Sequence, residues 1–183
     1  HLIVMSDLMK HRGPDDKGTF ISPDNKVGFG FRRLSIIDLN NGNQPINNST
    51  KDLSIVFNGE IYNYLELRKK LKMKGYSFST QTDTETILIG YEEWGEDIVH
   101  QLRGMFAFAI WDDKNRLVFI ARDRLGIKPL YYFKNSENFL FSSEIKSIIP
   151  FLGTDLEVNE EALSHYLTLA ATPAPMTMFS SIY

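Results

Sequence analysis

The segment Asn58-Gly59-Glu60 combines residue types that could stabilise a negatively charged reaction intermediate. It follows a run of apolar residues, 53–57, that has the pattern of a strand. An asparagine amide beside a backbone N–H is the donor pair that an oxyanion hole requires. Most Asn-Gly pairs are instead type I′ turns, although here a helical pattern follows and no returning strand. Both interpretations stay open on this motif alone.

Two charged residues could hold the ends of a small molecule. Arg33 lies beside Arg32 at the end of an apolar strand pattern, and its guanidinium is either a surface charge or a bidentate clamp for a carboxylate. Asp83 lies in the first turn of a predicted helix, where a carboxylate interacts favourably with the helix N-terminus. It could also receive a substrate ammonium. Spacing does not decide between these interpretations.

The other motifs argue against nucleotide and metal chemistry. Gly28-Phe29-Gly30 is an incomplete nucleotide-binding fingerprint, because Arg33 occupies the place of its third glycine. The four histidines have no partners at ligand spacing, and residues 112–115 lack the glycine and the terminal glutamate of a calcium loop. We therefore expect no metal site. The chain has no cysteine, so none of its own residues can act as a thiol nucleophile.

The elements that must position these residues can be predicted from periodicity and from turn signals. Asn63 and Thr82, each followed three residues later by a glutamate, have the spacing of capping boxes, and Gly75 and Gly95 end the two helical patterns. Further helices are expected over residues 98–102 and 159–167.

Strand patterns flank these helices. Residues 105–111 and 117–121 are mostly apolar and are joined by the polar residues 112–115, which predicts a hairpin at the centre of stacked layers. The hairpin-like pairs and the helical pairs together predict the α+β class with antiparallel sheets rather than a doubly wound α/β fold. The other strands are expected over residues 27–31, 53–57, 130–133 and 139–142.

Composition and charge exclude several classes of protein. The 183 residues are 43% hydrophobic and 23% charged, with a formal net charge of -3. A globular domain of this size buries roughly 70% of the surface that its unfolded chain exposes. The scattered basic residues give no footprint for nucleic acid, and no apolar run is long enough for a membrane helix. We expect a cytoplasmic domain over residues 1–172 that acts on a small molecule, with residues 173–183 beginning a linker.

Taken together and in this order, the motifs of the chain resemble the class II glutamine amidotransferases, and specifically the N-terminal domain of the asparagine synthetases. Each motif alone is weak, but seven in fixed order over nearly the whole chain are specific. The motifs are His11-Arg12-Gly13-Pro14-Asp15, Arg33-Leu34-Ser35-Ile36, Asn58-Gly59-Glu60-Ile61-Tyr62-Asn63, Thr82-Asp83-Thr84-Glu85, Gly104-Met105-Phe106-Ala107-Phe108-Ala109, Arg122-Asp123-Arg124-Leu125-Gly126 with Lys128-Pro129-Leu130-Tyr131-Tyr132, and Ser142-Ser143-Glu144-Ile145-Lys146.

This resemblance implies an Ntn-hydrolase-type fold, a four-layer αββα sandwich with two stacked antiparallel sheets. In the family, the mature N-terminal residue is a cysteine whose thiolate attacks the side-chain amide of glutamine. Its own α-amino group is the general base, which is chemically reasonable because an α-amine has a pKa near ~8. The resemblance places this cysteine and the first strand ahead of Leu2.

The resemblance also implies a role for each candidate site residue. Asn58 and the backbone N–H of Gly59 would form the oxyanion hole. Arg33 would bind the α-carboxylate of glutamine, and Asp83, with help from Glu60, would bind its α-ammonium. We expect all of these groups to face one cleft. His11 to Asp15, Arg122, Asp123 and Lys128 match the family as well and are interpreted as scaffold or interface residues.

The partners follow from the same resemblance. Glutamine is the substrate, and ammonia passes to a C-terminal synthetase domain of the same chain, where ATP and magnesium activate the acceptor. β-Aspartyl-AMP, which gives asparagine, is the expected acceptor. The glutaminase domain itself needs no cofactor, and a homodimer is left open. The alternative is a non-catalytic structural domain without the cysteine, as in relatives that resemble β-lactam synthetases.

Overall fold

The computed structural model describes residues 1–34, 43–153 and 156–183 of the chain. It divides into two units. The larger unit contains Leu2 and Met9–Lys128, and the smaller one contains His1, Ile3–Leu8 and Pro129–Tyr183. All five candidate site residues, Arg33, Asn58, Gly59, Glu60 and Asp83, belong to the larger unit.

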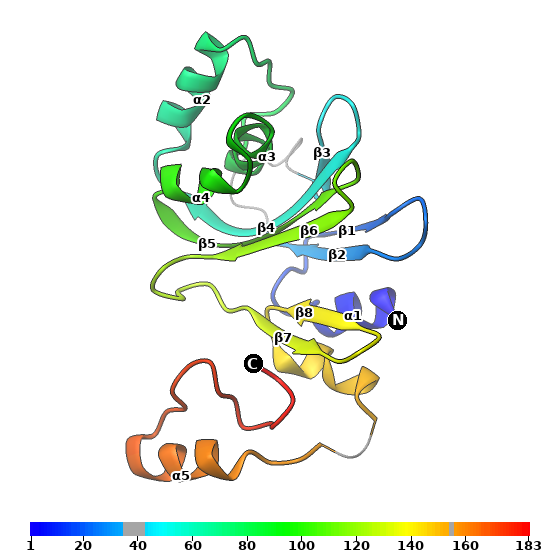
Figure 1. Cartoon of the computed structure of the whole chain (residues 1–183), viewed down its shortest axis with the longest axis vertical. Coiled ribbons are helices and arrows are strands. Elements are labelled where there is room, and N and C mark those ends of the chain that lie inside the picture. Colours follow the sequence, from blue (N-terminus) through cyan, green and yellow to red (C-terminus); the bar gives the residue numbers. More distant parts are fainter. Residues whose placement is uncertain (35–42, 154–155) are drawn as a thin grey trace. The chain divides into compact units, whose positions relative to one another are not determined.

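The larger unit is built on a four-stranded antiparallel sheet with the strand order β3-β4-β5-β6 (Figure 1). The ladder between β4 and β5 is the longest, running from Leu53 opposite Asp112 to Ile61 opposite Gly104. Strand β5 is buried from Phe106 to Asp112, because its apolar residues on both faces suit a central strand. The strands are β3 (Ile46–Asn47), β4 (Leu53–Ile61), β5 (Gly104–Asp112) and β6 (Leu117–Arg122).

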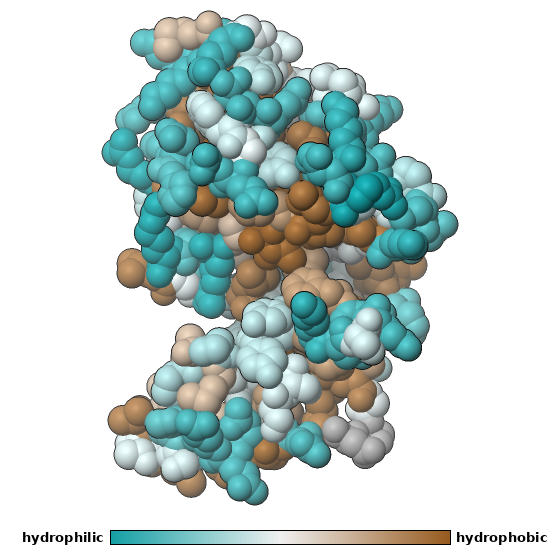
Figure 2. All heavy atoms as spheres, viewed as in Figure 1, coloured by the Kyte–Doolittle hydropathy of each residue, from teal (hydrophilic) through white to brown (hydrophobic). Residues whose placement is uncertain are grey.

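Helices cover one side of this sheet (Figure 1). They are α2 (Tyr64–Met73), α3 (Asp83–Trp94), the short 3₁₀ helix η1 (Gly95–Asp97) and α4 (Ile98–Gln101). Ile55 and Phe57 of β4 pack with Ile87 and Leu88 of α3 in the hydrophobic core. Burying one such side chain stabilises the fold by about 1.5–3 kcal/mol. The outer surface of the helices is mostly hydrophilic (Figure 2).

The predicted capping box at Thr82 forms only in part. The Thr82 hydroxyl oxygen accepts a hydrogen bond from the backbone N–H of Glu85 at 3.2 Å, as an N-cap should. The Glu85 carboxylate, however, accepts from the backbone N–H groups of Ser79 and Thr80 at 2.7 Å each. In a complete capping box the Glu85 carboxylate would accept from the N–H of Thr82, but here it binds the preceding loop instead. The helix α3 nevertheless starts where the sequence predicts.

The predicted capping box at Asn63 is wrong. Its side chain makes no hydrogen bond to the first turn of α2. Instead, the Asn63 amide donates to the carbonyl of Gln101 and accepts from the N–H of Arg103, both at 2.9 Å. These two bonds connect the start of α2 to the loop that precedes β5, and this pairing is too distant in sequence for a local motif to reveal.

A separate hairpin, β1 (Asp16–Ile21) and β2 (Gly28–Arg33), completes the larger unit. Its register pairs Phe20 with Phe29 and Asp16 with Arg33. The sequence predicted β2 in part but not β1. The exposed and half-buried residues of β1 alternate strictly, but only its last two residues, Phe20 and Ile21, are apolar. The hairpin matters for the site because Arg33 is its last residue.

The smaller unit contains α1 (Leu2–Leu8), the hairpin β7 (Tyr131–Lys134) and β8 (Phe139–Ser142), and α5 (Glu160–Leu169). Two short 3₁₀ helices, η2 (Ile145–Ser147) and η3 (Ile149–Phe151), follow β8. Near the end of the chain, Tyr183 exchanges two backbone hydrogen bonds with Tyr132 of β7, at 2.8 and 2.9 Å. A domain boundary after residue 172 stays a prediction.

The predicted α+β class with antiparallel sheets is confirmed, since every strand pair in the described part of the chain is antiparallel. One boundary differs in a way that bears on function. Strand β4 does not end before Asn58 but continues to Ile61, because Asn58 and Gly59 pair with Ala107 and Phe106 of β5. The Asn-Gly pair is therefore part of a strand, and its interpretation as a turn is wrong.

Within the described residues, none of the helices has the length and apolar character needed to cross a membrane.

Candidate functional site

The outer edge of β4, on the side of β3, is where the candidate donors lie. Leu53 directs its backbone groups to this edge, because its N–H donates to the Asn48 side chain and its carbonyl accepts from the Asn48 N–H. Backbone groups of every second residue of a strand point to the same edge. The N–H groups of Phe57, Gly59 and Ile61 therefore point to the edge used by Leu53.

The opposite strand supports this orientation of Gly59. Its partner in the ladder is Phe106 of β5. The Phe106 carbonyl accepts from the N–H of Asp123 at 2.8 Å, and its N–H donates to the Asp123 carboxylate at 3.2 Å. Since Phe106 directs both groups away from β4, the N–H of Gly59 points to the outer edge rather than to β5.

Only glycine fits at position 59. Its φ is +152°, which is rare for residues with a side chain. A Cβ atom there would lie 2.1 Å from the carbonyl oxygen of Met105 and 2.8 Å from Cα of Phe106. The close approach of β5 thus requires the absence of a side chain, and the Gly59 peptide is held in one place by backbone on its inner side.

Asn58 and Glu60 have their side chains on the face of β4 away from the helices. This follows from alternation, because Phe57 and Ile61 belong to the hydrophobic core on the helix side. Asn58 is half-buried and Glu60 is exposed. Asn58 and Gly59 are thus consecutive residues near the end of one strand, with the Asn58 side chain on one face and the Gly59 N–H at the edge.

Asp83 connects the start of α3 to the end of β4. Its carboxylate accepts from the N–H of Ile61 at 3.0 Å and from the N–H of Thr84 at 2.9 Å. The side chain is buried, and this burial raises the pKa of Asp83 above its ordinary value. The negative charge of Glu60 also raises this pKa, while the two N–H donors oppose the shift. A cation beside Asp83 would favour its charged form.

Arg33 is a buried cation at the end of β2. Its guanidinium donates to the side-chain oxygen of Asn43 at 3.1 Å. The loop before β1 fixes its backbone, since the Arg33 carbonyl accepts from the N–H of Asp15 at 3.0 Å. A Cβ atom on Gly13 would lie 2.5 Å from the Arg33 nitrogen, so the His11–Asp15 motif packs directly against this peptide. The motif thus supports Arg33 structurally.

Gln44 connects these parts, and the sequence did not single it out. Its side-chain oxygen accepts from the N–H of Phe57 at 2.6 Å, and its amide nitrogen donates to the Phe57 carbonyl at 3.1 Å. The same nitrogen lies 3.3 Å from the Thr84 hydroxyl. No local pattern reveals this role, because the partners are 13 and 40 residues away.

The Asp123 motif holds the loop after β6. Its carboxylate accepts from four backbone N–H groups, those of Phe106, Leu125, Ile127 and Lys128. Burial alone would raise the pKa of Asp123, but these donors hold it below its ordinary value. Arg122 donates to the carbonyls of Gly126 and Lys128, at 2.6 Å each. These contacts are those of a scaffold.

The structure therefore brings Asn58, Gly59, Glu60 and Asp83 to one end of β4. Hydrogen bonds through Asn43 and Gln44 connect Arg33 to the same strand. A single cleft that holds Arg33 and Asp83 together stays a prediction. Residues 35–42, which include part of the Arg33 motif, lie outside the described residues.

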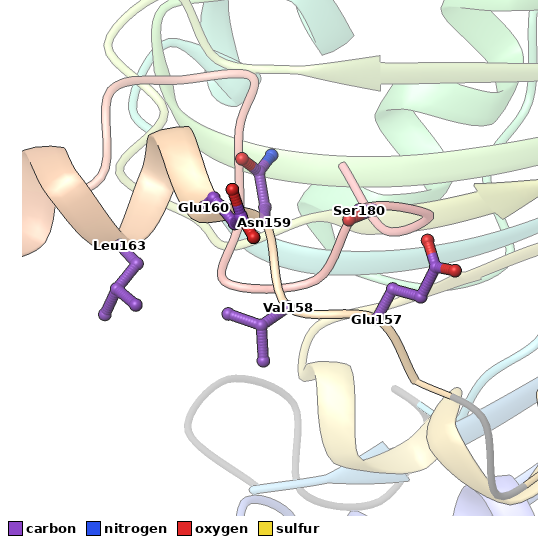
Figure 3. Close-up of a pocket in the computed structure, with 6 residues that line it drawn as sticks. All are labelled: Glu157, Val158, Asn159, Glu160, Leu163 and Ser180. Carbon is purple, nitrogen blue, oxygen red and sulfur yellow. The ribbon is translucent and has the colours of Figure 1, made fainter.

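A pocket of about 770 Å³ lies in the smaller unit (Figure 3). It surrounds the start of α5, and none of the candidate site residues lines it. The pocket is lined by Glu157, Val158, Asn159, Glu160, Leu163 and Ser180.

Among the residues that the structure describes, no group of three His, Cys, Asp or Glu side chains could hold a metal ion.

Comparisons with known proteins show the family of the chain. A family model described as "Glutamine amidotransferase domain" matches residues 1–183. The chain is 47% identical to asparagine synthetase (glutamine-hydrolyzing) 1 of Bacillus subtilis, over 95% of the chain and 27% of that protein. It is 42% identical to asparagine synthetase (glutamine-hydrolyzing) 3 of the same organism, over 94% of the chain and 28% of that protein. The chain thus spans little more than a quarter of the length of these relatives.

Among solved structures, the chain is similar to the glutamine phosphoribosylpyrophosphate amidotransferase from B. subtilis complexed with ADP and GMP. The TM-score is 0.56 with 22% identity, over 67% of this chain and 28% of that one. At this identity the likeness shows the fold alone. It confirms the predicted Ntn-type α+β sandwich.

Proposed function

The chain belongs to the glutamine amidotransferase domain family, and from this premise we propose that it is the glutaminase part of an asparagine-synthetase-like enzyme. The reaction is the hydrolysis of glutamine to glutamate and ammonia. The observation that supports the proposal is that Asn58 and Gly59 are adjacent residues near the end of β4, where the Gly59 N–H points to the outer edge. Outside the structure, the strongest support for the proposal is the match of the family model over all 183 residues.

In the proposed mechanism, a thiolate attacks the side-chain carbonyl carbon of glutamine. The electron pair of the carbonyl moves to its oxygen, where the Asn58 amide and the Gly59 N–H each donate a hydrogen bond. One such donor lowers the barrier by roughly 2.7–4 kcal/mol. The C–N bond then breaks, and the nitrogen leaves as ammonia with the proton that the α-amino general base had accepted from the thiol. Water hydrolyses the resulting thioester to glutamate and restores the thiol. Because the chain has no cysteine, the thiolate comes from residues outside these 183.

The two ends of glutamine are proposed to bind to the two buried charges. Arg33 pairs with the α-carboxylate, since a guanidinium binds a carboxylate with two parallel hydrogen bonds. Asp83 pairs with the α-ammonium, aided by Glu60. The raised pKa of Asp83 supports this assignment, because an ammonium at that point would offset the cost of its buried charge.

The fate of the ammonia is also a proposal. The relatives are named asparagine synthetases and are between three and four times as long as this chain. We propose that a synthetase domain of the same protein, with ATP and magnesium, accepts the ammonia on β-aspartyl-AMP. The glutaminase domain itself uses no cofactor.

A second candidate function is that of a non-catalytic structural domain of the same fold. Asn58→Ala in the full-length protein separates the two. We expect it to lower kcat for glutamine roughly 10²–10³-fold with little change in KM, because the oxyanion exists only after attack. Ammonia-dependent synthesis should be unchanged. Glutamate release with glutamine as the nitrogen source checks the first expectation, and formation of the amidated product with ammonia as the nitrogen source checks the second.

A matched control is Asn138→Ala, which changes an exposed asparagine in the loop between β7 and β8. An unchanged kcat for Asn58→Ala would remove this residue from the mechanism. A wild-type protein that releases no glutamate at all would support the structural domain instead.

A further inference from the structure

The side chain of Gln44 takes the position that a neighbouring strand would occupy. In an antiparallel sheet, a hydrogen-bonded residue donates its N–H to its partner and accepts a bond on its carbonyl. Phe57 of β4 makes both bonds, but with the amide of Gln44, at 2.6 and 3.1 Å. One side chain therefore replaces the backbone of a missing strand residue.

This replacement is needed because β3 is short. It pairs only with Ser54 and Ile55 of β4, through Ile46 and Asn47. The backbone groups of Phe57 lie two residues further along the same edge. Without Gln44 they would have no partner from β3, and the strand would be less firmly held just before Asn58 and Gly59.

Gln44 is itself fixed from three directions. Its amide nitrogen lies 3.3 Å from the hydroxyl of Thr84, the residue that follows Asp83. The preceding residue, Asn43, accepts a hydrogen bond from Arg33. A Cβ atom on Gly18 of β1 would lie 1.8 Å from the Gln44 carbonyl oxygen, so β1 packs closely against its backbone.

We propose that Gln44 is a positioning residue for glutamine hydrolysis, an inference that rests on the proposed function. It holds the Phe57 peptide so that the next two donors, the Asn58 amide and the Gly59 N–H, stay directed to the oxyanion. By bonding to Phe57 and Thr84 together, it also fixes the distance between these donors and Asp83. It does not touch the substrate.

The test uses Gln44→Met in the full-length protein, which keeps the size of the side chain and removes its three hydrogen bonds, two to Phe57 and one to Thr84. A misplacement of about 1 Å at a reacting centre costs roughly 10²-fold in rate. We therefore expect kcat for glutamine to fall roughly 10–100-fold while KM changes less than about 3-fold, because the oxyanion donors act mainly in the transition state. Ammonia-dependent synthesis should be unchanged.

Gln44→Glu gives a second readout that a merely structural role would not produce. When protonated, its carboxyl has one donor and one acceptor, which are enough for the two bonds to Phe57, whereas the charged form has no donor and repels the Phe57 carbonyl. The Phe57 carbonyl, which accepts a hydrogen bond at this position, favours the protonated form. The kcat of this variant relative to wild type should therefore rise as pH falls from 8 to about 6, while the ratio for Gln44→Met should stay flat.

Gln101→Met is the matched control, because Gln101 has an exposed side chain at the end of α4. It should behave as wild type. If Asn58→Ala lowers kcat and Gln44→Met does not, the positioning role is wrong and the proposed function stands. Equal losses of glutamine-dependent and ammonia-dependent activity in Gln44→Met, with no recovery of Gln44→Glu at low pH, would mean general unfolding. This result would also overturn the positioning role. A wild-type protein without glutaminase activity overturns both proposals.

Discussion

Replacing Gly59 by alanine tests whether the approach of β5 to β4 sets the oxyanion donors. The added Cβ would lie 2.1 Å from the carbonyl oxygen of Met105, more than 1 Å short of the 3.4 Å at which ordinary contact begins. The neighbouring atoms are backbone, so no side chain can rotate away. The two strands must separate, and the Gly59 N–H must move with them.

The expected loss in the free energy of unfolding has two parts. A residue forced into a rare φ costs of order 1–3 kcal/mol, and overpacking of a buried position typically costs about 1–3 kcal/mol more. We therefore expect Gly59→Ala to lower the free energy of unfolding by about 2–6 kcal/mol. A displacement of about 1 Å should lower kcat for glutamine roughly 10²-fold.

The control is Gly75→Ala at the end of α2. Gly75 also has a positive φ, +96°, but a Cβ atom there would meet nothing within 4 Å. The positive φ of Gly75 makes this variant less stable, but its added Cβ does not collide with another atom. Its kcat should therefore equal that of wild type. Urea denaturation gives the stability, and glutamate release gives kcat. Equal effects of Gly59→Ala and Gly75→Ala on both quantities would refute the role of the close approach.

Two further predictions concern Arg33 and Asp123. Arg33→Lys should raise KM for glutamine about tenfold or more with a smaller effect on kcat, since a lysine cannot make the bidentate pair, and steady-state kinetics on glutamine would check this. A change in kcat alone would remove Arg33 from substrate binding. Asp123→Asn should lower the free energy of unfolding by about 2–4 kcal/mol, because two of the four buried or part-buried N–H groups lose their acceptor. Since the folded pKa of Asp123 is lowered, its stabilising effect is present above the ordinary value of 3.8 and is lost as pH falls through the folded pKa. Denaturation at pH 7 and at low pH should therefore show the difference between wild type and variant shrinking with acid, and a constant difference would contradict it.

Much of the fold could be predicted from local patterns. The hairpin of β5 and β6 follows from two apolar runs with a polar loop between them, and α3 follows from its N-cap Thr82 and from Gly95 at its end. These features depend on residues within a few positions of one another. The order of the motifs then led to the family, which the comparisons confirm.

The parts that could not be predicted depend on partners far away in sequence. Asn63 has the right spacing for a cap, but its side chain makes hydrogen bonds to the backbone of the loop at Gln101–Arg103 instead. Strand β4 extends past Asn58 because β5 pairs with it there, which no local turn signal reveals. The link from Gln44 to Phe57 and Thr84 is a tertiary contact of the same kind.

The side chains along the outer edge of β4 also bear on solubility. An open strand edge is a template on which another chain can add a strand, and such edges promote aggregation. Here Gln44 and Asp83 occupy the hydrogen-bonding positions of Phe57 and Ile61, on either side of Gly59. A foreign strand would find two of three successive positions already taken. The Gly59 N–H thus lies between two occupied positions, which disfavours pairing of another polypeptide along this edge.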